Sequence, residues 1–348
     1  MTDRFLDSGI RYPWSTPPGQ GQATEVADGI LWMRLPLPML PDHVNVYALD
    51  DGDGWTLVDT GLDTRNIRAA WAVLRAGPLQ GKPVRRVIVT HHHPDHIGLA
   101  GWFVGQGAAL MTTRIAWLTA RMLVLDVQDR PTEQALTFYR RAGMPAEMID
   151  RRRGERPFNF ADCVHPLPPG YTRIADGDAV HAGGRDWIVR CGDGHAPEHA
   201  TLWSADGAVV LGGDQLLPGI SPNLGVYANE PEADPVGEWL DSCRRLSRFA
   251  TPEQLILPGH KLPYRGLTFR LAQMIENHHR ALVRLSGHLI EPATAVACFN
   301  ALFGRPLADA EFGLALAETV GHLNHLHKAG RITRRLREDG AWQWQKLA

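Results

Sequence analysis

Residues 91–96, with the sequence His-His-His-Pro-Asp-His, limit what this chain can fold into more than any other segment. They follow an apolar, β-branched run at 87–90, which predicts a buried strand that ends in this loop. In extended backbone, residues two positions apart point to the same side, so His91 and His93 can converge on one metal ion. The carboxylate and the last histidine of the segment then turn toward a second ion. The segment therefore predicts a metal site held at a strand end.

The spacing His-x-His-x-Asp-His resembles the signature of the metallo-β-lactamase-fold hydrolases. That family carries three further ligands in a fixed order, and His195, Asp214 and His260 occur here in that order. His195 lies in a Gly-His-Ala-Pro-Glu-His segment, which resembles the family's Gly-His-x-Pro-Gly-His with Glu198 at the usual glycine. Asp214 and His260 each follow an apolar run, and 57–61 resembles the strand-to-turn segment that supports the site. Five ordered matches argue strongly against coincidence.

The resemblance implies an α/β fold, the four-layer αββα sandwich of the metallo-β-lactamase superfamily. We expect this catalytic domain to span residues 1–264. Between 113 and 160 strand signals are sparse and helical spacing dominates, which predicts a helical insertion positioned where a lid over the site can form. For residues 265–348 we expect three helices and a β-hairpin, which resemble the winged-helix-like appendage of some family members.

Local patterns predict the main elements of both parts. Apolar alternation predicts strands, helical spacing predicts helices, and the turn composition of 50–54 predicts that the two strands around it pair as a hairpin. The expected strands are 30–35, 44–49, 55–58, 187–190, 201–204, 208–211 and 255–257; the expected helices are 66–75, 269–289, 293–303 and 315–329; the C-terminal hairpin strands are 331–333 and 342–344.

The resemblance also implies how the ligands divide between two divalent metal ions. The implied sets are His91, His93 and His195 for one ion, Asp95, His96 and His260 for the other, and Asp214 as the bridge. Imidazole and carboxylate ligands suit zinc, and iron or manganese can use the same set. A hydroxide bridging the ions is the implied nucleophile, because coordination lowers the pKa of water to about 7. We assign Asp95 and Asp214 as the catalytic residues.

Three further residues have expected roles near the site. The loop that follows Asp214 should form the pocket wall, so Asn223 and Tyr227 are candidate substrate contacts, although both also suit a role in shaping the loop. His199 lies close to His195 in the sequence, but the second histidine of this segment is generally not a ligand in similar proteins. We therefore expect it to support the ligands from behind.

Composition argues against a disulfide-rich secreted protein and against a membrane-spanning protein. The 348 residues carry a net charge of −2 and are 44% hydrophobic, which is typical of an ordinary soluble globular protein. The four cysteines are scattered without a Cys-x-x-Cys pair, so we expect no disulfide framework and a cytoplasmic location. No apolar run approaches the roughly 18 residues that a membrane span requires. We expect a soluble protein without a membrane partner, and a homodimer is compatible with the C-terminal appendage.

The expected function is hydrolysis of a small carbonyl substrate, either a thioester, an ester or a lactone. Lactonases of this family usually place a tyrosine shortly after the bridging aspartate, whereas this chain continues with Gln215, which favours a thioester or general ester. One alternative is a metal-dependent endoribonuclease or phosphodiesterase, because basic residues outnumber acidic ones near the C-terminus. The slightly negative whole chain disfavours nucleic acid as a partner. The other alternative is a non-catalytic metal-binding effector, which an intact ligand set argues against.

Overall fold

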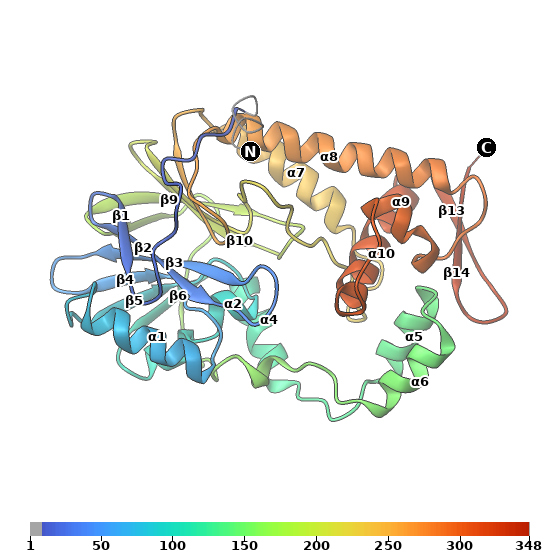
Figure 1. Cartoon of the computed structure of the whole chain (residues 1–348), viewed down its shortest axis with the longest axis horizontal. Helices are drawn as coiled ribbons and strands as arrows, with labels where there is room; N and C mark the ends of the chain where they lie inside the picture. The colour runs from blue at the N-terminus through green and yellow to red at the C-terminus, as the bar shows by residue number, and fades with distance from the viewer. Residues whose placement is uncertain (1–8, 348) are drawn as a thin grey trace. The chain divides into compact units, whose positions relative to one another are not determined.

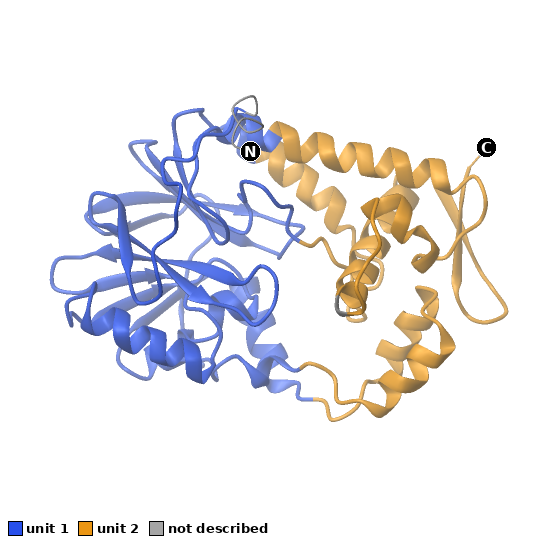
Figure 2. Ribbon diagram, viewed as in Figure 1, with its two compact units in different colours: residues 1–127, 159–222, 246–271 blue, residues 128–158, 223–245, 272–348 orange. Residues whose placement is uncertain are grey.

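The computed structural model describes residues 9–347, so the first eight residues of the predicted 1–264 domain and Ala348 lie outside it. The chain forms two compact units that alternate along the sequence (Figure 2). Unit 1 comprises residues up to 127, 159–222 and 246–271, and unit 2 comprises 128–158, 223–245 and 272–348. Within the described part, no helix is both long and apolar enough to cross a membrane.

Unit 1 is built on two β-sheets, one seven-stranded in the order β1 to β7 and one five-stranded in the order β12-β11-β10-β9-β8. The first sheet consists of β1 (Ala23–Ala27), β2 (Ile30–Pro36), β3 (His43–Asp50), β4 (Trp55–Val58), β5 (Val84–Ile88), β6 (Ala109–Thr112) and β7 (Thr172–Arg173). The second consists of β8 (Ala179–Ala182), β9 (Arg185–Gly192), β10 (His199–Ser204), β11 (Val209–Gly213) and β12 (Leu255–Pro258).

Helices accompany these sheets and make up most of unit 2. Unit 1 contains α1 (Arg65–Ala76), α2 (Pro94–Ile97), α3 (Ala100–Val104), α4 (Arg114–Leu125) and the 3-10 turn η1 (Phe160–Asp162). Unit 2 contains α5 (Glu133–Arg141), α6 (Ala146–Gly154), η2 (Val296–Cys298), α9 (Phe299–Phe303), η3 (Asp309–Glu311), α10 (Phe312–Lys328), β13 (Ile332–Leu336) and β14 (Trp342–Lys346). Helices α7 (Pro235–Ser247) and α8 (Leu267–His288) each have residues in both units.

Strand β3 shows how one strand serves both hydrophobic layers of unit 1. Val44, Val46 and Ala48 are fully buried on one face and belong to the cluster that includes residues of α1 and α3. Tyr47 and Leu49 point to the other face and pack with side chains of the second sheet. Because successive side chains alternate between faces, a strand covered on both sides is apolar almost throughout. This pattern is what a layered αββα arrangement requires.

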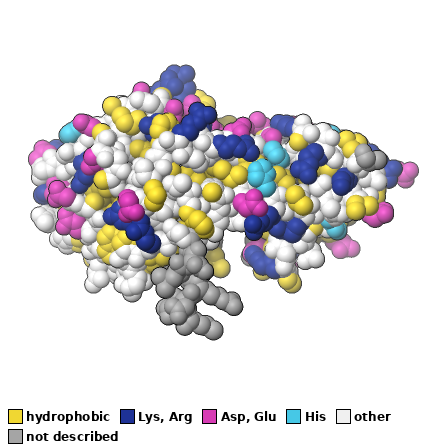
Figure 3. Space-filling view, turned by 90° about the horizontal axis from the view of Figure 1, so that it is seen from above, with side chains coloured by type: hydrophobic (Ala, Val, Ile, Leu, Met, Phe, Trp, Pro, Cys, Tyr) yellow, Lys and Arg dark blue, Asp and Glu magenta, His cyan; other side chains and the backbone are white. Residues whose placement is uncertain are grey.

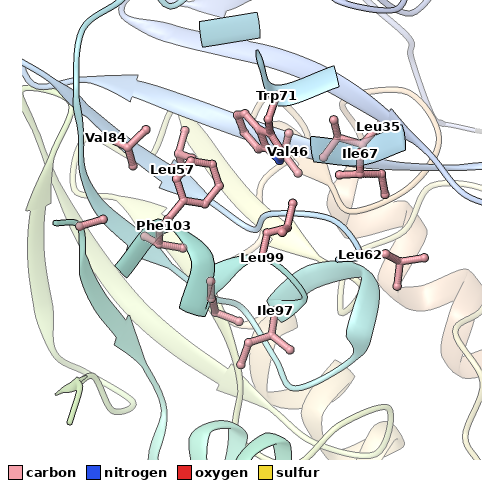
Figure 4. Close-up of a cluster of buried hydrophobic side chains, with 14 of the residues drawn as sticks. Leu35, Val46, Leu57, Leu62, Ile67, Trp71, Val84, Ile97, Leu99 and Phe103 are labelled. Carbon is pink, nitrogen blue, oxygen red and sulfur yellow. The ribbon is translucent and has the colours of Figure 1, made fainter. Parts of the chain in front are cut away.

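The layer between the first sheet and the helices also anchors the metal loop. Figure 1 shows α1 lying against the seven-stranded sheet, and Figure 4 shows the side chains packed beneath it. Trp71 of α1 meets Phe103 of α3 edge to face, with ring centroids 5.0 Å apart. Its indole N–H donates to the carbonyl of Thr60 (2.8 Å), and the Thr60 hydroxyl donates to the carbonyl of His96 (2.9 Å). The core thus holds the turn after β4 against α2.

Most of the predicted regular elements are confirmed, with small shifts at their ends, but the helix expected at 293–303 is the 3-10 turn η2 followed by the short helix α9. The strands expected at 44–49 and 55–58 pair antiparallel as β3 and β4, and the helix expected at 66–75 is α1. The C-terminal hairpin is also confirmed, as β13 and β14. Prediction failed at 89–90, since β5 ends at Ile88 and these two residues already belong to the metal loop. Strands β1, β6, β7 and β8 and helix α7 were not predicted.

The division into units differs from the two consecutive domains expected at 1–264 and 265–348. Residues 128–158 and 223–245 belong with the C-terminal segment because they pack on it. The amide of Val226 donates to the carbonyl of Ala317 (3.0 Å), and the amide of Val296 donates to the carbonyl of Ala142 (3.4 Å). The insertion expected at 113–160 is indeed helical, but α4 lies in unit 1 while α5 and α6 lie in unit 2. Its function as a lid stays a prediction.

Candidate metal centre

Each expected ligand lies at or just beyond the end of a strand of unit 1. His91 and His93 follow β5, and the short helix α2 carries Asp95 and His96. The remaining three come from the second sheet: His195 follows β9, Asp214 follows β11 and His260 follows β12. Strands β4 and β5 run parallel, as do β11 and β12, so their carboxyl ends meet at one edge of each sheet. The topology therefore brings together residues that lie up to 169 positions apart in the chain.

The side chains form three overlapping groups in which the ligand atoms lie within 4.8 Å of one another. The groups are His91, His93 and His195; His91, His96 and Asp214; and Asp95, His96 and His260. The first and third groups coincide with the two ligand sets that the sequence resemblance implies. The second group joins them through Asp214. All seven expected ligand residues thus converge on one small volume.

Asp214 approaches ligands of both sets through its carboxylate oxygens. Its Oδ1 is 3.4 Å from His96 Nε2, and its Oδ2 is 3.5 Å from His195 Nε2 and 3.2 Å from His260 Nε2. Asp95 Oδ2 is 3.4 Å from the same His260 nitrogen. These separations are longer than charge-assisted hydrogen bonds, which are commonly about 2.7–2.9 Å. They suit ligand atoms that share a cation.

The donor atoms fit a metal better than they fit one another. Among the described residues, His96 Nε2 and Asp214 Oδ1 are buried and make no hydrogen bond, an arrangement that normally costs stability. His91 Nε2 and His93 Nδ1 lie 3.1 Å apart, so two lone pairs meet there unless a proton or a cation intervenes. A methyl group on Gly259 would lie 2.2 Å from Asp214 Oδ1, so this position needs glycine. The residues present therefore fit divalent metal ions.

Burial and charge divide the ligands into two electrostatic groups. Burial, together with nearby imidazoles, lowers the pKa of His91 and of His93 well below the usual range, which keeps these rings in the neutral form that coordinates metals. Burial alone would also lower the pKa of His260, but the carboxylates of Asp214 and Asp95 raise it to about 10. Conversely, burial opposes ionisation of Asp214, yet His260 and His96 hold its pKa well below the usual range. This half of the site stabilises positive charge.

Asp59 and Thr90 orient two of the rings from behind. His96 Nδ1 donates to Asp59 Oδ2 (2.7 Å), which directs the Nε2 lone pair of His96 toward the ligand cluster. His91 Nδ1 lies 2.9 Å from the hydroxyl of Thr90, which donates to Asp59 Oδ2 over the same distance. Asp59 has a φ of 63°, a conformation few non-glycine residues adopt. The strand-to-turn segment 57–61 thus supports the site, as the resemblance implies.

Strand β3 orients His260, which the sequence did not indicate. His260 Nδ1 donates to the carbonyl of His43 (2.7 Å), and the amide of Lys261 donates to His43 Nε2 (2.9 Å). Asn45 Nδ2 and the Tyr47 hydroxyl both donate to the carbonyl of Pro258, over 2.9 and 2.8 Å. The local sequence of β3 gives one sign of this role, because polar side chains stand two positions apart near the start of an otherwise apolar strand. It marks Asn45, but it does not reveal the partner.

His199 belongs to none of the three ligand groups. It is fully buried at the start of β10, and its Nε2 accepts a hydrogen bond from the amide of Asp214 (3.1 Å). The ring stacks on that of His91, with centroids 4.5 Å apart. A methyl group on Gly213 would lie 2.5 Å from His199 Cε1, so the close approach also depends on that glycine. The supporting position predicted from the sequence agrees with these contacts.

The two expected substrate contacts lie in unit 2 and not among the ligand groups. Asn223 Nδ2 donates to Glu318 Oε2 (3.1 Å) and to the carbonyl of Leu314 (3.2 Å). Tyr227 is half-exposed. These contacts match the loop-shaping alternative for Asn223, and substrate contact stays a prediction for both residues.

Comparison with known proteins gives matches over both parts of the chain. Residues 39–260 match the family model described as Metallo-beta-lactamase superfamily, and residues 282–347 match the model described as Metallo-beta-lactamase-like, C-terminal domain. The Probable metallo-hydrolase YqjP of Bacillus subtilis is 27% identical over 312 residues, covering 88% of this chain and 94% of that protein. A Hydroxyacylglutathione hydrolase of Cereibacter sphaeroides is 25% identical over 240 residues, covering 69% of this chain and 70% of that protein.

A solved structure extends the similarity to the whole fold. The crystal structure of a beta-lactamase domain protein from Burkholderia ambifaria superposes with a TM-score of 0.88 and is 35% identical. The alignment covers 97% of this chain and 98% of that one. The similarity therefore includes the C-terminal helices and hairpin as well as the two sheets.

Proposed function

Because this chain belongs to the metallo-beta-lactamase superfamily, we propose that it is a metal-dependent hydrolase that cleaves a small carbonyl substrate, with a thioester as the first choice. One observation carries the proposal: the Asp214 carboxylate lies next to ligands of both sets, which are His91, His93 and His195 for one ion and Asp95, His96 and His260 for the other. This is the arrangement that two ions sharing one carboxylate require.

Divalent ions held by these residues would supply Lewis acidity toward a carbonyl oxygen and would lower the pKa of a water molecule. The rest of the chemistry belongs to the chain. Asp59 and the carbonyl of His43 hold His96 and His260 in the tautomer whose Nε2 lone pair faces the cluster. The Asp214 carboxylate, kept ionised by its neighbours, can accept the proton of the attacking water. No serine or cysteine nucleophile is needed.

Two observations favour a thioester over a lactone. One relative is named Hydroxyacylglutathione hydrolase, an enzyme whose substrate class is a thioester, and it aligns over 69% of this chain. In addition, the residue after Asp214 is Gln215, whose fully buried side chain replaces the phenol that lactonases of this family generally carry nearby. Zinc is the proposed metal because imidazole and carboxylate ligands suit it, with iron or manganese as alternatives.

The decisive experiment measures metal content and initial rates on one preparation. Protein purified without added metal should contain close to two metal ions per chain. It should cleave S-lactoylglutathione or an acyl-coenzyme A in preference to a homoserine lactone, an aryl ester, a bis-aryl phosphodiester and a cephalosporin. Asp214→Ala should lower the rate by at least about a thousandfold and reduce bound metal. Asp186→Asn, a change at an exposed aspartate of the β8–β9 hairpin, should alter neither.

Each alternative function predicts a different result. Cleavage confined to the phosphodiester would favour the nuclease, and a biological effect that survives Asp214→Ala in folded protein would favour the effector.

The charge of the C-terminal hairpin weighs against the nuclease, because two of its arginines are already paired with carboxylates. Arg334 pairs with Glu232 (2.8 Å) and Arg337 pairs with Asp339 (2.8 Å). On the face drawn in Figure 3, basic and acidic side chains are interspersed. Such a surface neutralises few phosphates.

A further inference from the structure

Unit 2 contains a cavity of its own, with a volume of about 370 Å³, which lies within the size range of small-molecule sites. Helix α5, the 228–232 loop, helix α10 and the C-terminal hairpin supply its walls, and all of them belong to unit 2. The lining residues include Thr137, Phe138, Arg141, Val320, Arg334 and Trp342. No residue of the candidate metal centre is among them.

The floor of the cavity is apolar and firmly held. Phe138, Ala142, Val320 and Trp344 are each at least nine-tenths buried, and they come from α5, the residue after it, α10 and β14. Asn324, from the same helix as Val320, donates through Nδ2 to the carbonyls of Pro231 (3.0 Å) and Ala233 (2.9 Å). These bonds fix the neighbouring loop against α10. The cavity is therefore shaped for a rigid apolar body.

The charged groups at the cavity leave one positive charge without a partner. Arg334 binds both oxygens of Glu232, at 2.8 and 2.9 Å, and Glu133 pairs with Arg153, which does not line the cavity. Among the described residues the Arg141 side chain makes no hydrogen bond or ion pair, and its guanidinium lies 5.5 Å from the ring centroid of Trp342.

Trp342 has a second cation over its ring, since the Arg334 guanidinium lies 4.6 Å from the ring centroid. Stacking on one indole positions both guanidinium groups at the cavity. Because Glu232 already neutralises Arg334, the group left to bind an anion is Arg141, whose planar guanidinium matches a carboxylate.

From this combination we propose that unit 2 holds a second binding site, independent of the metal centre, for a small carboxylate with an apolar or aromatic body. The body lies against Phe138, Val320 and Trp344, and the carboxylate pairs with Arg141. The inference goes beyond the proposed hydrolase function, since it needs neither the metal ligands nor their chemistry.

Isothermal titration with 2-naphthoate tests the proposal, with the uncharged 2-naphthamide as the comparison ligand. The intact chain should bind one naphthoate saturably and naphthamide at least about tenfold more weakly. Arg141→Gln should weaken naphthoate binding by about tenfold or more and leave naphthamide unchanged. Arg140→Gln is the matched control, because Arg140 lies in the last turn of the same helix without lining the cavity, and it should change neither value by more than about twofold.

A second variant tests the location. Thr137→Phe places a ring in the cavity and should abolish binding of both ligands while the thermal unfolding midpoint stays close to that of the parent chain. Any one of three results would overturn the proposal: no saturable binding of naphthoate, equal losses in the two arginine variants, or full binding by folded Thr137→Phe protein. Since no step depends on turnover, failure here leaves the hydrolase proposal untouched.

Discussion

Asp59 contributes to the candidate metal centre without being one of its ligands. Its carboxylate accepts hydrogen bonds from His96 Nδ1 (2.7 Å) and from the amide and hydroxyl of Thr90 (2.9 Å each). Asp59→Asn should therefore weaken metal retention by about 10- to 100-fold, because the carboxylate that fixes the His96 tautomer is lost. Competition with a chromogenic chelator measures this. Asp53→Asn, at an exposed turn, should bind like the parent, and equal affinities in all three proteins would contradict the role.

Glu318 predicts a pH dependence in unit 2. Burial raises its pKa to about 7, although the hydrogen bond from Asn223 opposes the shift. Since the folded-state pKa lies above the ordinary value near 4.5, this group stabilises unit 2 fully below pH 4.5, and the contribution is lost as pH rises through 7.

Urea unfolding of the parent and of Glu318→Gln at pH 5 and pH 8 measures this effect. The variant should gain stability relative to the parent at pH 8, by on the order of 2 kcal/mol, because it cannot ionise. Glu338→Gln, in the turn of the C-terminal hairpin, is the control and should follow the parent at both pH values. A Glu318→Gln profile parallel to the parent would show that the group does not ionise in this range.

At the scale of elements, α1 links the hydrophobic layer to the metal loop. Thr64 caps it by accepting a hydrogen bond from the amide of Ile67 (3.3 Å), and Trp71 on its buried face holds the carbonyl of Thr60. Thr64→Ala should lower the free energy of unfolding by about 1 kcal/mol, whereas Thr64→Ser should keep most of it, since serine caps equally well. Chemical denaturation distinguishes the two, and equal losses would assign the effect to the methyl group instead of the cap.

At the scale of the whole molecule, all seven expected ligands lie in unit 1. Removing metal with a chelator should therefore destabilise unit 1 selectively, by about 2.7 kcal/mol when the free metal had been at 100 times its dissociation constant. Hydrogen exchange should speed up in 89–98, 193–199 and 258–261 and stay unchanged in α10 and in the hairpin of β13 and β14. A uniform increase across both units would show that they unfold together.

Local sequence was sufficient for most of the central strands and for the expected ligands. Apolar alternation reports directly on burial, and the ligands of this family follow strand ends at recognisable spacings, so Asp214 and His260 could be found without coordinates. Strands β6 and β8 were missed because they are short and only half of their residues are buried, whereas the equally short β4 and β12 are mostly apolar and buried throughout.

The family, the layered α/β fold and the residues expected to hold metal could all be inferred from the sequence, because short motifs with characteristic spacings follow one another in a fixed order along the chain. The groups that orient those residues became apparent only from the three-dimensional packing. The carbonyl of His43 reaches His260 across 217 positions, and main-chain groups carry no sequence signature. The packing also decided that 128–158 and 223–245 join the C-terminal helices, and that the Arg141 side chain is left unpaired beside Trp342. Such contacts depend on how distant segments pack, which local periodicity does not encode.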